Sequence, residues 1–201
     1  MKPKVEFRFS EIYDSLFKEN YSYEKEWGKY PNASEIKNYI KKIEIKWKEI
    51  GNLILKEISD ISGLTWQEDK IICYVIGKTI PFSDPLTVPV YEDEADYIID
   101  VITHELIHQI FIQNEGKLKN YWEYIGKKYS KENPVTKIHI ILHAIHKTIY
   151  LKLFDEARLK RDIEWISDIE EYKRSWEIVK KEGHKNIIKE FKLKTNQNSQ
   201  I

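Results

Sequence analysis

The one short motif in this chain with a defined chemistry is His104-Glu105-Leu106-Ile107-His108, the HExxH pattern. Two histidines four positions apart on a helix lie one turn above each other on the same face. Both imidazoles can therefore reach one Zn²⁺ ion. Glu105 lies beside that face, where its carboxylate can take a proton from a metal-bound water. The pattern indicates a metal-dependent hydrolytic site.

The motif has this meaning only inside a helix, and its surroundings predict one over residues 95–111. Apolar residues recur there at three and four positions, and the segment contains neither Gly nor Pro. Acidic residues at 92–94 and 96 precede it, where the helix dipole favours negative charge, and Gly116 predicts a helix stop. A lone histidine on such a face is usually a core residue, but two at ligand spacing around a glutamate favour metal binding. They extend an apolar stripe: Tyr97, Val101, His104, His108 and Phe111.

A zinc ion that keeps one position open for water needs a third protein ligand. The chain has six histidines, and three of them lie in a second apolar segment, residues 134–154. This segment predicts a helix that Thr136 can cap. Four of its side chains have i, i+4, i+7, i+11 spacing and form one stripe: His139, His143, His146 and Tyr150.

Either His139 or His143 is the expected third ligand, because the sequence does not rank one above the other. The neighbouring histidine or the phenol of Tyr150 could donate a hydrogen bond to an oxyanion. His146 is the third choice of histidine ligand and is equally compatible with a solvent-facing position. Glu156 is the reserve ligand, because a carboxylate can replace histidine. Five further carboxylates are weaker candidates, the first two as ligands and the others as groups that orient a ligating imidazole: Glu115, Glu123, Asp155, Asp162 and Asp168.

At the HExxH motif the chain resembles the zincin metallopeptidases. In that group the two histidines bind zinc and the glutamate is the general base, so the resemblance implies these roles for His104, His108 and Glu105. The metzincin extension HExxHxxGxxH is absent, because Gln-Ile-Phe-Ile-Gln follows at 109–113. The third ligand is then expected from further along, as in gluzincin-type zincins. Gluzincins use a glutamate there, and the histidine stripe departs from that pattern.

Zincins also place an edge strand above the active-site helix, where the substrate backbone pairs with it. Residues 70–80 are rich in β-branched and aromatic residues and predict a strand. Residues 86–91 predict a second extended segment, which Pro89 limits to an edge strand or a loop. Such an edge could pair with an extended peptide. A purely structural sheet fits the same pattern.

The other apolar patterns predict a mainly helical chain. Ser34 is expected to cap a scaffold helix that runs to about Ser59. Further helices are predicted at 121–129, 163–179 and 186–191. The aromatic-rich residues 5–30 predict a strand or a short helix, and the polar residues 194–201 predict a frayed end.

Composition limits the classes of partner. The 33 basic and 33 acidic residues give no net charge, which argues against a nucleic acid. The single cysteine, Cys73, cannot form an internal disulfide and is expected to be a buried, inert thiol. The chain has no apolar signal core and no apolar run of 18 residues, so we expect a soluble cytoplasmic protein without a membrane partner.

Together these patterns predict one mainly helical α+β domain over residues 1–201, with a small mixed sheet before the HExxH helix. Residues 1–115 would form the half that carries the motif, and residues 116–201 would supply the third ligand. The expected function is zinc-dependent hydrolysis of a peptide or protein substrate. Two alternatives stay open: an inactive module that zinc stabilises or that binds a protein, and a metal-free helical domain.

Overall fold

The computed structural model describes residues 2–19, 28–91 and 96–196, and it confirms the mainly helical α+β fold with a small mixed sheet. The chain divides into two compact units. We call residues 1–52 and 68–109 the sheet unit, and residues 53–67 and 110–201 the helical unit. The longer segment of the helical unit begins at residue 110, close to the division that the sequence predicted after residue 115. The shorter segment, residues 53–67, was not predicted to belong to this half.

The described residues form eight helices. None of them is both long enough and apolar enough to cross a lipid bilayer. Their bounds are α1 (Glu11–Glu19), α2 (Ala33–Ser62), α3 (Tyr97–Ile112), α4 (Glu115–Lys128), α5 (Pro134–Leu153), α6 (Glu156–Trp165), α7 (Glu170–Glu182) and α8 (His184–Asn196).

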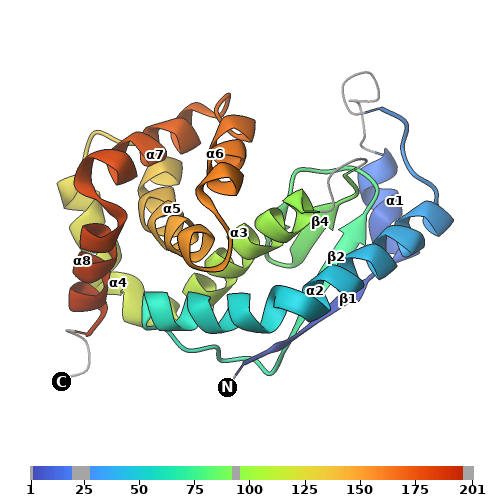
Figure 1. Ribbon diagram of the computed structural model, residues 1–201, viewed down its shortest axis with the longest axis horizontal. Helices are drawn as coiled ribbons and strands as arrows, with labels where there is room; N and C mark the ends of the chain where they lie inside the picture. Colours follow the sequence, from blue (N-terminus) through green and yellow to red (C-terminus); the bar gives the residue numbers. More distant parts are fainter. Residues whose placement is uncertain (1, 20–27, 92–95, 197–201) are drawn as a thin grey trace. The chain divides into compact units, whose positions relative to one another are not determined.

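The sheet has the strand order β1-β2-β4-β3. Its strands β1, β2 and β4 are labelled in Figure 1. The strands β1 (Lys4–Arg8), β2 (Lys70–Ile76) and β4 (Leu86–Pro89) are parallel neighbours. The two-residue strand β3 (Phe82–Ser83) pairs antiparallel with β4 and forms an edge. The strands predicted at 70–80 and 86–91 are therefore present as β2 and β4, with shorter bounds.

The prediction that Pro89 limits its strand to an edge is wrong, because β4 lies between β2 and β3. Pro89 is the last residue of β4, whereas β3 pairs only with Leu86 and Thr87. The missing N–H of the proline therefore interrupts no hydrogen bond to β3.

Helices α2 and α3 pack on one face of the sheet. Phe7 and Cys73 are partners in the β1–β2 ladder and point to this face. Phe7 meets Trp47 of α2 edge-on, with ring centroids 6.0 Å apart. Burial and the nearby charge of Glu105 on α3 raise the pKa of the Cys73 thiol. The expectation of a buried, unreactive cysteine is confirmed.

Helix α1 packs on the opposite face. Its Tyr13 contacts Tyr74 of β2, with centroids 5.0 Å apart, and shares a 3.1 Å hydrogen bond with Thr87 of β4. Phe17 stacks on Phe82 of β3 at 5.9 Å. Residues 5–30 thus contain both a strand and a short helix. Their aromatic residues Tyr21, Tyr23 and Trp27 lie outside the described residues.

Asn32 caps α2, so the prediction that Ser34 is the cap is wrong. The side-chain oxygen of Asn32 accepts hydrogen bonds from the backbone N–H groups of Ser34 and Glu35 at 2.9 and 3.0 Å. The Glu35 carboxylate accepts from the Asn32 N–H at 2.6 Å, which completes a capping box. Ser34 supplies one of the unsatisfied N–H groups rather than the acceptor.

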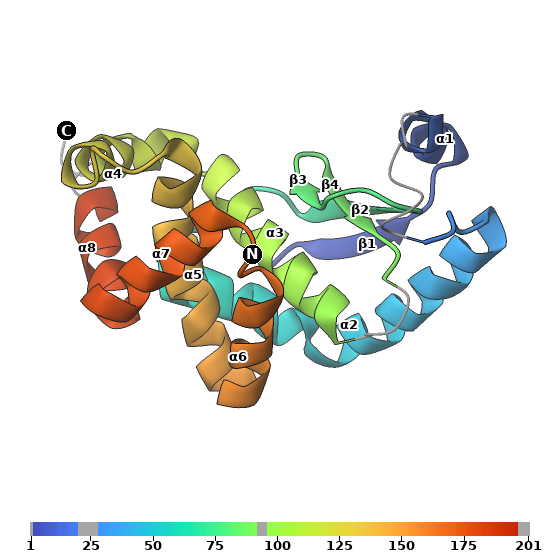
Figure 2. The ribbon, with the colours of Figure 1, turned by 90° about the horizontal axis from the view of Figure 1, so that it is seen from above.

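In the helical unit, α5 packs against α6, α7 and α8, and α4 packs against α8 (Figure 2).

Asn133 caps α5 by accepting from the N–H of Thr136 at 2.8 Å, so Thr136 is not the cap. Gly116 lies inside the first turn of α4 and does not stop a helix. The helix predicted over 163–179 is interrupted, because α6 ends at Trp165 and α7 begins at Glu170. Between them the Ser167 hydroxyl donates to the Glu164 carbonyl at 2.7 Å.

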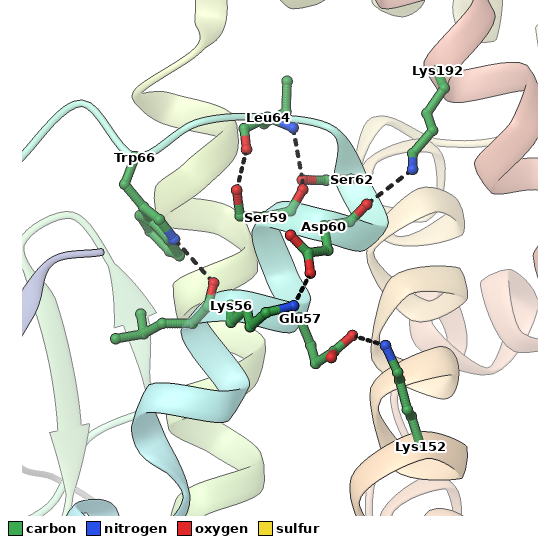
Figure 3. A network of polar contacts seen from close by, with 10 residues as sticks. Lys56, Glu57, Ser59, Asp60, Ser62, Leu64, Trp66, Lys152 and Lys192 are labelled. Carbon is green, nitrogen blue, oxygen red and sulfur yellow. Dashed lines mark hydrogen bonds and ion pairs between the residues drawn. The ribbon is translucent and has the colours of Figure 1, made fainter. Parts of the chain in front are cut away.

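The last turns of α2 are bonded to the helices of this unit (Figure 3). Glu57, only 6% exposed, accepts from the ammonium group of Lys152 on α5 at 2.5 Å. Lys192 of α8 donates to the Asp60 carbonyl at 2.9 Å. Gly63 then ends the helix with a positive φ of 75°, a conformation that favours glycine. These contacts explain why residues 53–67 belong to the helical unit.

Gly77, which follows β2, should not tolerate a side chain. Its N–H donates to the Asp14 carboxylate at 2.7 Å, and that carboxylate also accepts from the Tyr30 hydroxyl at 2.7 Å. A Cβ at Gly77 would overlap the Tyr30 ring. We expect Gly77→Ala to lower the free energy of unfolding by about 1–3 kcal/mol in urea titrations, because overpacking strains the core.

The matched control is Gly126→Ala in α4, where nothing lies within 4 Å of the added Cβ. This change should raise stability by about 0.5–1 kcal/mol, because alanine loses less backbone entropy in a helix. Equal effects of the two substitutions would contradict the close packing of Tyr30 on Gly77.

Candidate metal centre

The HExxH motif lies in the middle of α3, as predicted. The half-buried rings of His104 and His108 have centroids 5.2 Å apart, as expected for neighbours one turn apart. At the start of α3 the Asp96 carbonyl accepts from the Ile99 N–H at 3.1 Å, and its carboxylate pairs with Lys46 at 2.6 Å. The acidic residues at 92–94 lie outside the described residues.

Glu105 is 6% exposed and faces the sheet side of α3. Burial raises its pKa to about 8, because a carboxylate is poorly solvated away from water. Burial raises the pKa of Tyr91, the residue two positions beyond β4, and the charge of Glu105 is a smaller cause in the same direction. A cation beside Glu105 would favour the ionised carboxylate, which is the form that accepts a proton.

The edge strand β3 is attached to α3 directly after the motif. The side-chain amide of Gln109 donates a hydrogen bond to the Ser83 carbonyl of β3. Because Gln109 follows His108, this bond fixes the sheet edge next to the motif. An edge strand beside the HExxH helix was expected, but the sequence assigned it to residues 86–91 rather than to β3.

On α5, the surroundings of His139 favour a neutral ring with its lone pair on Nε2. Its Nδ1 lies 2.7 Å from the Val135 carbonyl. A carbonyl only accepts, so Nδ1 carries the hydrogen and Nε2 carries the lone pair. Burial lowers the pKa of His139 to about 4, so the ring is neutral at pH 7, and neutral imidazole is the form that binds metals.

One ligand nitrogen from each of His104, His108 and His139 lies within 4.8 Å of the others. Three nitrogens bound tetrahedrally to one Zn²⁺ at about 2.0–2.1 Å are about 3.4 Å apart. Three imidazoles suit Zn²⁺ and other late first-row ions. Of the two histidines that the sequence left open, His139 is the one that groups with the motif pair as residues that could hold a metal ion.

The other members of the α5 stripe are buried and lie outside this group. His143 is fully buried, with Nδ1 2.5 Å from the Ser175 hydroxyl and its ring stacked on Trp176 at 4.3 Å. His146 is 2% exposed, so the solvent-facing alternative is wrong. Its ring lies 4.6 Å from that of Tyr150, which is fully buried.

The carboxylate candidates also lie outside the three-histidine group. Glu156 is exposed at the first residue of α6, and Glu115 and Glu123 are exposed on α4. Asp155 caps α6 by accepting from the Arg158 N–H at 2.7 Å. Asp168 is exposed, whereas Asp162 is buried.

Sequence reasoning missed the residues of α7 that contact the α5 histidines. They are Tyr172, Ser175 and Trp176, which fall on one helical face by their i, i+3, i+4 spacing. That spacing was visible in the sequence, but nothing in it connected α7 to α5.

His146 should make the stability of the metal-free protein depend on pH. Burial, and then the charge of Arg158, lower its pKa from 6.5 to about 3. Between these values the unfolded chain binds a proton that the folded protein does not. Stability should therefore fall as the pH drops from about 6.5 towards 3, by up to ~1.4 kcal/mol per pH unit.

The measurement is urea denaturation at several pH values with a chelator present. His146→Gln should show a shallower pH dependence than the wild type, since the proton-binding group is lost from both states. Parallel curves for the two proteins would show that His146 is protonated equally when folded and unfolded.

Comparison of the chain with protein-family models, with curated proteins and with solved structures finds no match. The resemblance to zincins therefore depends on the motif and on the geometry around it.

Proposed function

We propose that this protein is a zinc-dependent peptide-bond hydrolase whose metal ligands are His104, His108 and His139. The observation that supports it is that these three nitrogens lie within 4.8 Å of one another; Glu105, which follows His104 in the chain, is buried. Three protein ligands leave a fourth tetrahedral position for water, which is the arrangement of catalytic rather than structural zinc.

When bound, zinc lowers the pKa of a water ligand to about 7 and polarises a carbonyl group. In the proposed reaction Glu105 takes the proton of the attacking water at its carboxylate and passes it to the leaving amine. The edge strand β3 offers backbone groups for pairing with an extended peptide, and Gln109 fixes that strand to α3. Tyr150 is fully buried and lies about three helical turns beyond His139 on α5, so the predicted role as hydrogen-bond donor to the oxyanion is not part of this proposal.

The second candidate is an inactive module that zinc stabilises. The proximity of His143 favours it, because its ring centroid lies 5.4 Å from that of His139, although a change of side-chain position would be needed to bring His143 into the three-histidine group. A fourth imidazole nitrogen would close the coordination sphere and exclude water.

Metal titration tests the proposal. Protein stripped with a chelator should take up one Zn²⁺ or Co²⁺ per chain, and the zinc-loaded protein should cleave an unfolded protein substrate. The absence of stoichiometric metal uptake would contradict both candidates. Uptake of one ion without any cleavage would favour the structural module.

A further inference from the structure

Helix α7 lies against the face of α5 that carries His139 and His143. The Tyr172 ring lies 4.2 Å from that of His139, at an interplanar angle of 32°. The Trp176 ring is nearly parallel to that of His143, at 9° and 4.3 Å. Ser175 lies between these two aromatic residues in the chain and bonds to His143. One face of α7 therefore fixes the planes of both imidazoles.

The hydrogen bonds of Ser175 determine the tautomer of His143. The Ser175 hydroxyl is 2.8 Å from the Tyr172 carbonyl, which can only accept, so the hydroxyl uses its one hydrogen there. At His143 the same oxygen must accept, over 2.5 Å. Nδ1 of His143 therefore carries the hydrogen and Nε2 carries the lone pair, as in His139.

This direction of bonding excludes a nucleophilic serine–histidine pair. The imidazole would have to accept the hydroxyl hydrogen, whereas Ser175 donates it to a backbone carbonyl. Ser175 is also fully buried. The bond has a positioning role instead.

We propose that Ser175 is a positioning residue of the metal centre. It fixes His143 in the Nδ1–H tautomer, and the His143 ring in turn supports the ligand His139, from which it is separated by 5.4 Å between centroids. This inference rests on the proposed function. It also changes one expectation: in the Nδ1–H tautomer His143 has an acceptor rather than a donor at Nε2, so it is not a hydrogen-bond donor to an oxyanion.

Nitrogen-15 NMR of the imidazole rings in the metal-free protein tests the tautomer directly. The His143 signals are assigned by their loss in His143→Gln. Wild type and Ser175→Thr, which keeps the hydroxyl, should show a protonated Nδ1 and an unprotonated Nε2. Ser175→Ala should show a mixture of tautomers. A protonated Nε2 in the wild type, or an unchanged spectrum in Ser175→Ala, would overturn the proposal.

Ser62→Ala is the matched control, because Ser62 is also fully buried and its hydroxyl also makes two hydrogen bonds (Figure 3). It should change neither the His143 spectrum nor the zinc affinity. Ser175→Ala should lower zinc affinity about tenfold, the lower end of the range for partners that orient a ligand, and Ser175→Thr should restore it. Equal losses in Ser175→Ala and Ser62→Ala would overturn a positioning role.

The tautomer is read without metal, so the two proposals fail in different ways. If the chain binds no zinc, it has no metal centre and Ser175 has no positioning role in one, even if the spectra show the Nδ1–H form of His143. If the chain binds zinc but His143 has the Nε2–H tautomer, the proposed function stands and the inference about Ser175 is wrong.

Discussion

His139→Ala should lower the zinc affinity more than a hundredfold, which would exceed the 10–100-fold loss that follows removal of a partner that only orients a ligand. Its ligand nitrogen lies within 4.8 Å of those of His104 and His108, so alanine removes one of three donors. With its pKa lowered to about 4, His139 needs no deprotonation at pH 7, and its whole donor strength is lost. Competition with a chromophoric chelator measures the change.

Two variants control for other causes. Glu156→Gln alters the exposed reserve carboxylate and should leave zinc affinity unchanged. His143→Ala makes a comparable truncation in the same helix, yet it should cost only about tenfold, because His143 acts through the orientation of His139. If His143→Ala abolished binding while His139→Ala bound zinc normally, His143 would be the third ligand.

Thermodynamic linkage gives a second readout of the same change. Zinc at a hundred times its dissociation constant stabilises the wild type by about 2.7 kcal/mol. His139→Ala should lose this increment at the same zinc concentration, whereas Glu156→Gln should keep it. Comparing each variant with and without zinc separates lost binding from lost packing.

The helices that carry the site were predictable because their signal is local. The apolar spacing of α3 and α5 reflects burial of one face, and it gave both helices nearly their full length. The caps were not predictable in the same way. Asn32 and Asn133 each lie within three residues of a Ser or Thr that could also cap, and the choice depends on where the backbone leaves the helix.

The proposed site shows the same division. Local spacing was enough to single out His104, Glu105 and His108, but it did not rank His139 and His143, which lie one turn apart on one face of α5. Tertiary contacts separate them, because Ser175 and Trp176 hold His143. The edge strand β3 escaped prediction because two residues are too few to show alternation.

Glu105→Gln should leave zinc binding within about threefold and lower hydrolysis by about 10²–10⁴, the range of general acid–base catalysis. Glutamine has nearly the same shape, so the buried position beside the sheet stays filled, and Glu105 is not one of the three ligand residues. An amide nitrogen and oxygen do not take a proton from water at neutral pH. The binding and catalytic functions should therefore separate in this single variant.

Glu123→Gln, an exposed carboxylate on α4, is the matched control and should retain full activity. The decisive measurement is the initial rate of cleavage at saturating zinc, with bound metal quantified in the same sample. Undiminished cleavage by zinc-loaded Glu105→Gln would show that another group accepts the proton. A variant that loses zinc together with activity would show instead that Glu105 helps hold the ion, since the amide differs from the carboxylate mainly in charge.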